Sequence, residues 1–464
     1  MVRIDDSLTS NLLRPQLERF FEISAVKIRS LAGSWNPAEG SPVLTVRGKY
    51  TTRAWADWTQ GFQFGSALLQ FEAAGDPWFL EWGRRSTLAY MPKHLTNVGG
   101  HDHGFNNVSS YGNLLRLAVE GRRVEPDERV EQYRLALRVS GAVQAARWTS
   151  LPDGGYIHSF HGPHSLFVDT IRSLRSLALA HCLGQVLIGE GDKRISLLDR
   201  LVQHALTTAK YCVFYGEGRD HYDVCGRVAH ECIFDVTNGT YRSTSTQQGF
   251  SPFSTWTRGL AWAMLGFAEQ LEFLASRSDQ ELERFGGIVP VEHVMRRAAE
   301  SSCNYYLDQA AADGIPYWDT AAPGLSSLPG FQDRSSDPFN DYEPVDSSAA
   351  AIAAQALWRF GTYLSTVSGS DSVIQQGTKY RKAALIVART LFTKPYLSED
   401  LPHEGLILHS IYNRPGGWDH VPPNRRIPCG ESTMWGDYHA LELAVLLWRD
   451  LQGEAYPTFF PRNL

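Results

Sequence analysis

Two kinds of helix-forming segment alternate along this chain, and this alternation restricts its fold more than any other feature. Six segments are long and amphipathic, with one apolar stripe and one charged face. Six others, placed between them, are rich in small and apolar residues and carry few charges. The amphipathic segments span residues 13–31, 78–91, 128–146, 193–215, 291–307 and 371–392, and the apolar segments span residues 61–71, 111–119, 169–183, 258–271, 346–360 and 438–448.

A helix that is apolar on nearly all sides must be buried, whereas a helix with a polar face suits the outside of a domain. No stretch shows the sustained period-two alternation that a sheet requires. We therefore predict an all-α fold, a single (α/α)6 barrel of six inner and six outer helices. No Pro/Gly/Ser-rich linker interrupts the chain, so residues 1–464 are predicted to form one domain. Three long connections, 149–168, 216–256 and 308–345, are expected to carry function, because loops of this length usually do.

Composition narrows the class of protein. The net charge is −6, from 44 basic and 50 acidic residues, and no basic run indicates a nucleic acid or a membrane surface as partner. No apolar stretch approaches the roughly 18 residues of a membrane span, and the first residues lack the apolar core of a signal peptide. The six scattered cysteines form no C-x-x-C pair and read as reduced thiols. We expect a cytoplasmic protein, monomeric or homodimeric, with a small-molecule partner.

Aspartates stand at the start of several apolar segments. Asp102 lies between His101 and His103, and Asp169 follows a loop of Gly, Pro and His. A carboxylate at such a position can cap the helix, which is the interpretation we favour for Asp346 and Asp437. For Asp102 and Asp169 we favour a catalytic role. The inner helices of one barrel bring their N-termini to the same mouth, and two carboxylates across a cleft are the minimum for acid-catalysed attack of water on a sugar.

A metal is the alternative use of the two histidines. His101 and His103 are two residues apart and could share an ion, but no H-E-x-x-H motif or Cys/His cluster offers a third ligand. We therefore predict neither a metal nor another cofactor.

The most specific stretches follow one another in a fixed order, and together they resemble the unsaturated glucuronyl hydrolases, glycoside hydrolase family 88. A more distant resemblance is to the unsaturated rhamnogalacturonyl hydrolases. The likeness extends from about residue 55 to residue 448. The stretches that carry it are His101-Asp102-x-Gly104-Phe105, Val168-Asp169-Thr170, His230-x-x-x-Phe234-Asp235, Gln248-Gly249-Phe250, STWTRGLAWA at 254–263, Asp346-Ser347-Ser348-Ala349-Ala350 and Trp435-Gly436-Asp437-Tyr438.

The resemblance implies hydration of the C4=C5 double bond of an unsaturated uronic acid, the end group that polysaccharide lyases leave on an oligosaccharide. It implies that Asp169 is the general acid/base. Asp102 would hold the sugar and raise the pKa of Asp169 by like-charge proximity. The residues that the resemblance assigns to substrate binding are His230 for a hydroxyl or the water, Gln248 and Arg258 for the uronate carboxylate, Trp256 and Trp262 for stacking on the ring, and Trp58 and His101.

The chain departs from the family pattern at four positions that lie near the sugar pocket in the family. They are Gln63, Phe160, Gln247 and Leu260.

Each of three assigned residues also has a purely structural interpretation. Arg258 can form a salt bridge to an acid at a helix end, His230 can be a loop histidine with satisfied hydrogen bonds, and Trp262 can belong to the core. Three rival functions stay open as well: an inverting hydrolase of saturated glycosides that uses Asp102 and Asp169, a sugar-binding barrel without turnover, and a sugar epimerase with histidines as acid and base.

Overall fold

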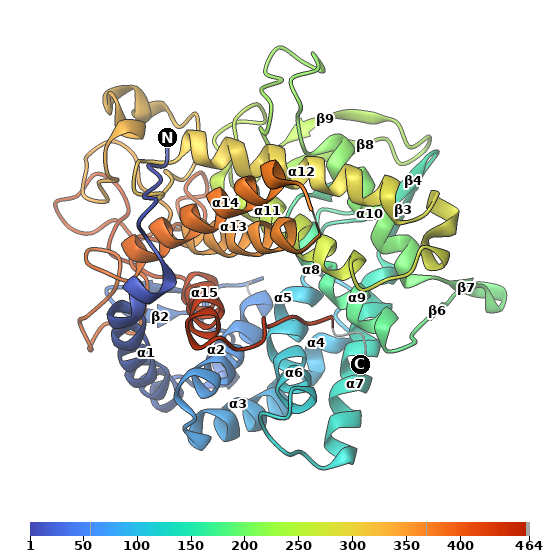
Figure 1. Ribbon diagram of the computed structural model, residues 1–464, viewed down its shortest axis with the longest axis horizontal. Coiled ribbons are helices and arrows are strands. Elements are labelled where there is room, and N and C mark those ends of the chain that lie inside the picture. The colour runs from blue at the N-terminus through green and yellow to red at the C-terminus, as the bar shows by residue number, and fades with distance from the viewer. Residues whose placement is uncertain (56, 368, 461–464) are drawn as a thin grey trace.

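The computed structural model describes residues 1–55, 57–367 and 369–460, and these residues form a closed ring of helical hairpins (Figure 1). The outer helices are α1 (Arg14–Ser34), α3 (Pro77–Tyr90), α7 (Asp127–Ala146), α10 (Leu197–Tyr211), α12 (Ile288–Gln309) and α14 (Asp371–Leu391). The inner helices are α2 (Gln60–Ala74), α5 with η4 and α6 (His103–Asn107, Val108–Gly112 and Asn113–Val119), α8 with α9 (Thr170–Ser173 and Arg175–Cys182), α11 (Thr257–Leu274), α13 (Ser347–Val367) and α15 (Met434–Gln452).

The predicted (α/α)6 barrel is confirmed, and each of the twelve expected segments contains a helix in its expected layer. Two inner helices are less regular than expected. The second begins already at His103 and passes through a π-helical turn, η4, before α6. The third is divided into α8 and α9 at Leu174. Between α3 and α5 lies one further short helix, α4 (Pro92–Leu95).

Local sequence signals set the hairpins, as the connection from α2 to α3 illustrates. Gly75 ends α2 in the left-handed conformation, with φ 68°, which glycine adopts without a steric penalty. The next residue, Asp76, accepts a hydrogen bond from the Trp78 backbone N–H at 2.9 Å and so caps α3. Pro77 occupies the first position of α3, where no backbone donor is needed. An inner helix therefore passes to an outer one within two residues.

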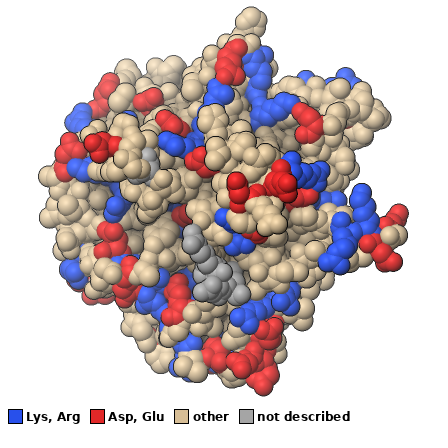
Figure 2. Space-filling model, turned by 45° about the vertical axis from the view of Figure 1, so that its right-hand side comes forward, with Lys and Arg blue, Asp and Glu red and all other residues tan. Residues whose placement is uncertain are grey.

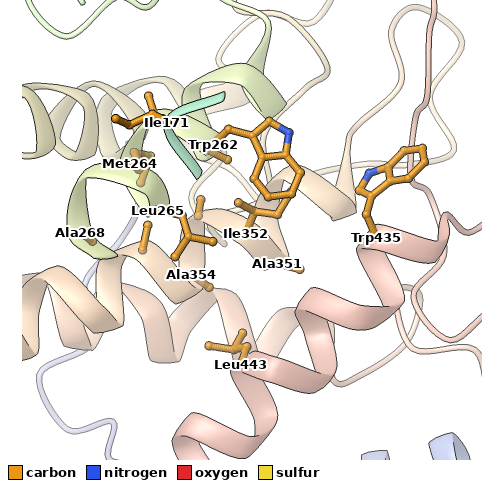
Figure 3. Close-up of a cluster of buried hydrophobic side chains, with 14 of the residues drawn as sticks. Ile171, Trp262, Met264, Leu265, Ala268, Ala351, Ile352, Ala354, Trp435 and Leu443 are labelled. Atoms are coloured by element: carbon orange, nitrogen blue, oxygen red, sulfur yellow. The ribbon is translucent and has the colours of Figure 1, made fainter. Parts of the chain in front are cut away.

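The inner helices pack on one another through small and branched side chains. Every residue of α11 except Glu272 is buried, and α13 is rich in buried alanine. Figure 3 shows side chains of α11, α13 and α15 meeting in one apolar cluster, together with Ile171 of α8. The last inner helix, α15, packs against both α13 and α2, which closes the ring.

Strands are short and lie in the connections. In the described part of the chain no sheet exceeds three strands, which agrees with an all-α barrel. The two-stranded hairpins are β1 (Leu44–Val46) with β2 (Lys49–Thr51), β3 (Trp148–Leu151) with β4 (Gly154–Ile157), and β6 (Leu187–Ile188) with β7 (Arg194–Ile195). The three-stranded sheet has the antiparallel order β5 (Ser165–Phe167), β8 (Glu231–Phe234), β9 (Tyr241–Ser245).

The chain end closes the ring at the C-terminal ends of the inner helices. After α15 the last described residues cross this end (Figure 1). Arg449 donates to the carbonyl of Ala455 at 3.0 Å, and the Tyr456 hydroxyl donates to Glu272 at 2.7 Å. Phe459 lies under the Arg175 guanidinium, 5.1 Å from it. A functional site is therefore expected at the opposite end of the barrel, where the inner helices begin.

The surface carries both charge signs. On the face that Figure 2 shows, Lys and Arg are interspersed with Asp and Glu, without one continuous basic area. Among the described residues, no helix combines the length and the apolarity needed to cross a bilayer.

Candidate active site

A cavity of about 690 Å³, partly open to solvent, lies at the N-terminal ends of the inner helices. Its walls come from five segments that are far apart in the sequence. The lining residues are Ala54, Trp55, Trp58, His101, Asp102, Phe105, Phe160, Phe167, Asp169, Gln247, Gln248, Trp256, Arg258, Trp262, Tyr412 and Trp418.

The structure brings together nearly all of the residues that the sequence points to. Eight of the nine candidates line this cavity, and the ninth, His230, lies behind its wall. The His230 ring packs against Phe167 and Trp256, with ring centroids 4.7 and 4.5 Å away.

A close helix contact places Asp102 beside Asp169. A Cβ on Gly104 would lie 2.1 Å from the Ser173 carbonyl oxygen, so only glycine lets α5 approach α8 this closely. The Gly104 backbone N–H donates to the Ser173 hydroxyl at 2.8 Å. That hydroxyl in turn donates to the His101 carbonyl at 2.7 Å. The segment before α5 is therefore fixed against the start of α8.

His101 lies between the two carboxylates. Its Nε2 is 3.2 Å from Asp169 Oδ1, to which it donates a hydrogen bond, and 3.7 Å from Asp102 Oδ1. The imidazole is almost fully buried, whereas the side chains of Asp102 and Asp169 keep 22% and 13% of their surface accessible from the cavity. Neither carboxylate makes a capping hydrogen bond to its own helix. Both are therefore free to meet a ligand.

The charge distribution differs from the sequence-based expectation. Burial raises the pKa of Asp102, and the nearby Asp169 charge adds to this effect. Burial also acts to raise the pKa of Asp169, but the hydrogen bond from His101 and its charge outweigh burial and lower that pKa. The expectation that Asp102 raises the pKa of Asp169 is wrong, because the imidazole between the two carboxyls outweighs that effect.

The second histidine of the pair points elsewhere. His103 is held by Ser140 Oγ at Nδ1, 3.0 Å away, and by the Asn97 carbonyl at Nε2, 2.9 Å away. Burial lowers the pKa of His103 to about 4, so it is neutral. In the described residues no three His, Cys, Asp or Glu side chains are grouped so that they could hold a metal ion.

Strand pairing positions His230. The antiparallel pair β5–β8 joins Phe167 to Glu231, and the Val168 N–H donates to the His230 carbonyl at 2.9 Å. The backbone N–H of Gln247 donates to His230 Nδ1 at 3.1 Å, so the ring proton belongs on Nε2. This Nε2 is buried and has no hydrogen-bond partner among the described residues, and burial lowers the pKa of His230 to about 4. His230 is thus a neutral donor behind the cavity wall.

Arg258 lines the cavity, but its four Nη hydrogens are already engaged. Nη1 contacts Asp346 at 3.2 Å and donates to the Ile411 carbonyl, while Nη2 donates to the Tyr412 carbonyl at 2.7 Å and to Gln248 Oε1 at 2.6 Å. Arg258 therefore forms the salt bridge to an acid at a helix end, Asp346, that the structural interpretation predicts. A two-pronged Arg258 clamp on a uronate would have to displace these partners.

Gln248 is oriented by this contact. Because its Oε1 accepts from Arg258, its amide NH₂ is the group left for a ligand. The loop that carries Gln248 is anchored at Asp319, which accepts from the Phe250 N–H and the Ser254 hydroxyl, both at 2.9 Å. A neutral donor backed by a buried cation therefore faces the cavity.

Aromatic side chains form the walls and the floor. Trp58 stacks on Trp435 with ring centroids 5.0 Å apart. Trp262 lies between Phe105 and His439, at 4.7 and 5.0 Å, and is nearly inaccessible, so it combines the core and cavity roles.

Sequence reasoning missed a whole wall of the cavity. Tyr412 and Trp418 come from the connection between α14 and α15, which was not among the three loops expected to carry function. The stretch NRPGGWD at 413–419 holds turn residues beside a tryptophan and could have marked it. Asp419 fixes this loop by accepting from the Tyr412 and Asn413 backbone N–H groups.

Of the two aspartates predicted to cap helices, one does so and the other does not. Asp346 caps α13, because its Oδ1 accepts from the Ser348 N–H at 3.0 Å. For Asp437 the cap prediction is wrong: Thr433 caps α15, and Asp437 instead accepts from the Tyr50 hydroxyl at 2.6 Å and from two backbone N–H groups at 406–407.

Two of the four departures from the family pattern line the cavity, namely Phe160 and Gln247. The other two do not: Gln63 borders a separate cavity between α1, α2 and α15, and Leu260 is buried in the core.

The chain is similar in sequence and in structure to known proteins. No protein-family model matches the chain. A curated relative from Bacillus sp. (strain GL1), named unsaturated glucuronyl hydrolase, is 27% identical over 420 residues, which cover 88% of this chain and 90% of the relative. A relative of the same name from Formosa agariphila is 27% identical over 389 residues, 83% of this chain and 78% of the relative. The solved structure of the Bacillus sp. GL1 unsaturated glucuronyl hydrolase matches with a TM-score of 0.69 at 24% identity, over 95% of this chain and 98% of that one.

Proposed function

We propose that this chain, which is related to the unsaturated glucuronyl hydrolases over most of its length and shares their fold, is a glycoside hydrolase of unsaturated uronic acid oligosaccharides. Its substrates are the 4,5-unsaturated glucuronyl ends that polysaccharide lyases produce. The whole chain acts as one catalytic domain.

One observation carries the proposal. Asp102 and Asp169 lie at the same mouth, on either side of His101 Nε2, and both are accessible from an aromatic cavity. The buried rings of Trp262 and Phe105 line the cavity, which fits a site that encloses the end of a sugar chain. Flat rings with a polar edge suit the faces of a sugar.

The proposed reaction hydrates the substrate double bond. The Asp169 carboxyl gives its proton to C4, and the positive charge that develops at C5 is shared with the ring oxygen. Water then adds at C5 while Asp169 takes one proton from it, so the carboxyl is restored. The resulting hemiketal opens, and the bond to the next sugar breaks with the hemiketal proton passing to the leaving oxygen. Asp102, as the neighbouring carboxyl, holds a sugar hydroxyl.

Gln248 and Arg258 recognise the uronate in this proposal. The Gln248 amide donates to the carboxylate, and the Arg258 guanidinium behind it supplies positive potential without leaving Asp346. This replaces the direct Arg258 fork that the sequence alone implied.

Gln248→Glu is therefore expected to weaken substrate binding, because it exchanges a donor for a second negative charge while keeping the partner of Arg258. KM for an unsaturated uronate should rise by about 10- to 100-fold, the scale of a lost hydrogen bond to a charged group, about 1.5–3 kcal/mol. Steady-state kinetics measures it, with Gln247→Glu on the same wall as the matched control for added charge. An equal rise for a neutral analogue that lacks the carboxylate would remove the assigned role.

Incubation with a panel of lyase-derived unsaturated disaccharides tests the function itself. Turnover is expected to remove the ultraviolet absorbance of the double bond, and in heavy water the product should carry deuterium at C4. Saturated disaccharides form the second arm. Release of sugar from them without loss of absorbance in the first arm would favour an ordinary inverting hydrolase and contradict the hydration proposal.

The cytoplasm is the proposed place of action. All six cysteines are free thiols, and Cys212 and Cys232 lie with their sulfur atoms 3.7 Å apart without a bond. Unpaired neighbouring thiols fit a reducing compartment. The proposed partner is a small oligosaccharide, with neither nucleic acid nor membrane involved.

A further inference from the structure

The proposed reaction leaves one question open, namely where the proton for C4 is held before the reaction. Asp169 has to be a carboxylic acid at the moment of transfer. Its surroundings favour the carboxylate, because His101 donates a hydrogen bond to it and the His101 charge lowers its pKa. A group that donates to Asp169 is also the nearest source of a proton for it.

We propose that His101 is a positioning residue that stores this proton between its Nε2 and Asp169 Oδ1. It thereby protonates the Asp169 carboxylate before each turnover. This inference rests on the proposed function. In the step, the Nε2–H bond breaks and an O–H bond forms on Asp169, so that an imidazolium and a carboxylate become an imidazole and a carboxylic acid. No proton from solvent is needed. After Asp169 has taken a proton from water, the reverse transfer restores the ion pair.

The geometry of the ring fits this role. Nε2 lies 3.2 Å from Asp169 and 3.7 Å from Asp102, so both carboxylates face the same nitrogen. Phe160 stacks on the imidazole at 5.9 Å, and Phe167 meets it edge-on at 5.6 Å, which restricts its rotation. The proton is therefore confined to a short path that points at Asp169.

The backbone of His101 is held as tightly as its ring. Its carbonyl accepts from Gln144 Nε2 at 2.9 Å and from the Ser173 hydroxyl at 2.7 Å.

The groups around the imidazole set its charge. Asp102 and Asp169 favour the imidazolium, while Arg147 at the end of α7 opposes it. His158 after β4 and His204 on α10 also face it. His103 lies two residues further along the chain, at the start of α5. Burial lowers the pKa of His103, His158 and His204, so all three are neutral.

The balance favours the charged ring. Burial acts to lower the pKa of His101, but the two carboxylates outweigh it and raise that pKa. In the described residues no acceptor faces the buried Nδ1. The two carboxylates therefore sustain the charge on the ring against burial and Arg147, and neutralising one of them favours release of the proton.

His101→Gln tests the inference through the pH profile. Glutamine keeps an N–H donor near the Nε2 position but cannot store a proton. For the wild type, kcat/KM should fall as pH rises through the pKa of His101, which the two carboxylates raise. In the variant the carboxyls alone must hold the proton, so the falling limb should move about two pH units toward acid, the gap between the ordinary pKa values of histidine and carboxyl groups. At pH values above both limbs this equals about a 100-fold loss of kcat/KM.

His103→Gln is the matched control, because His103 is an equally buried histidine that contacts neither carboxylate. It should leave the limb in place. A uniform loss of kcat/KM for His101→Gln at every pH, with an unmoved limb, would show a merely structural role and overturn the inference. That outcome differs from failure of the proposed function, in which the wild type itself would not turn over unsaturated disaccharides.

A second measurement needs no variant of His101. Nuclear magnetic resonance of histidine-labelled protein should give a raised His101 pKa in the wild type and a lower one in Asp169→Asn. An unchanged pKa in Asp169→Asn would contradict proton sharing between the two residues.

Discussion

Asp169→Asn should lower kcat by about 10²- to 10⁴-fold on an unsaturated disaccharide, the usual contribution of general acid–base catalysis, while KM changes little. Asparagine preserves the shape and the contact with His101 but has no transferable proton. The side chain makes no capping hydrogen bond to α8, so the substitution does not weaken the start of that helix. Kinetics that follow the ultraviolet absorbance of the double bond measure the effect.

Asp153→Asn is the control for that variant, since Asp153 is an exposed aspartate paired with Lys210 at the surface. It should turn over like the wild type. Near-wild-type kcat for Asp169→Asn would contradict the assignment. If Asp102→Asn were then the inactive variant, the acid would be Asp102, whose pKa burial already raises.

The layers of the barrel could be predicted because each depends on a pattern within one segment. Residues 258–271 are apolar on nearly all sides, and this pattern requires burial in α11. The start of the second inner helix could not be predicted in the same way. Residues 103–107 are mostly polar, and they become helical because Gly104 lets them pack against Ser173, a contact between distant segments.

The site shows the same division. Asp102 and Asp169 could be found, since helix starts in one barrel converge and the surrounding motifs are specific. The pKa order of the two carboxyls could not, because it depends on the 3.2 Å contact that places His101 between them. Arg258 and Gln248 were both identified, yet their mutual hydrogen bond, which turns the Gln248 amide toward the cavity, exists only in three dimensions.

The largest effect on stability is expected below the cavity, where a group of charged side chains is buried among the apolar residues of the inner helices. Arg172 contacts Glu269 at 2.9 Å and Glu442 at 3.3 Å. Arg359 contacts Glu272 at 3.0 Å and also faces Glu442. Arg175 completes a cluster of three arginines and three glutamates. All six side chains are about nine-tenths buried or more.

Glu442→Gln should destabilise the fold by about 3–5 kcal/mol, because removing one partner leaves buried positive charge uncompensated. For a chain of this length the unfolding entropy is about 1 kcal/mol per degree, so the thermal midpoint should fall by about 3–5 °C. Scanning calorimetry checks this. Glu18→Gln is the control, since Glu18 pairs with Arg14 on the surface at 4.0 Å and should shift the midpoint by less than about 1 °C.

A double variant separates charge from packing. Arg172→Met with Glu442→Leu removes one charge of each sign and fills the space with apolar groups, so it should recover most of the lost stability. If Glu442→Gln alone were neutral, the cluster would not depend on charge balance. Arg172 lies one helical turn after Asp169 on α8, so the same variants also report on the site. Because the cluster fixes the helix and not the chemistry, kcat of the folded double variant should stay within about tenfold of the wild type, far from the loss expected for Asp169→Asn.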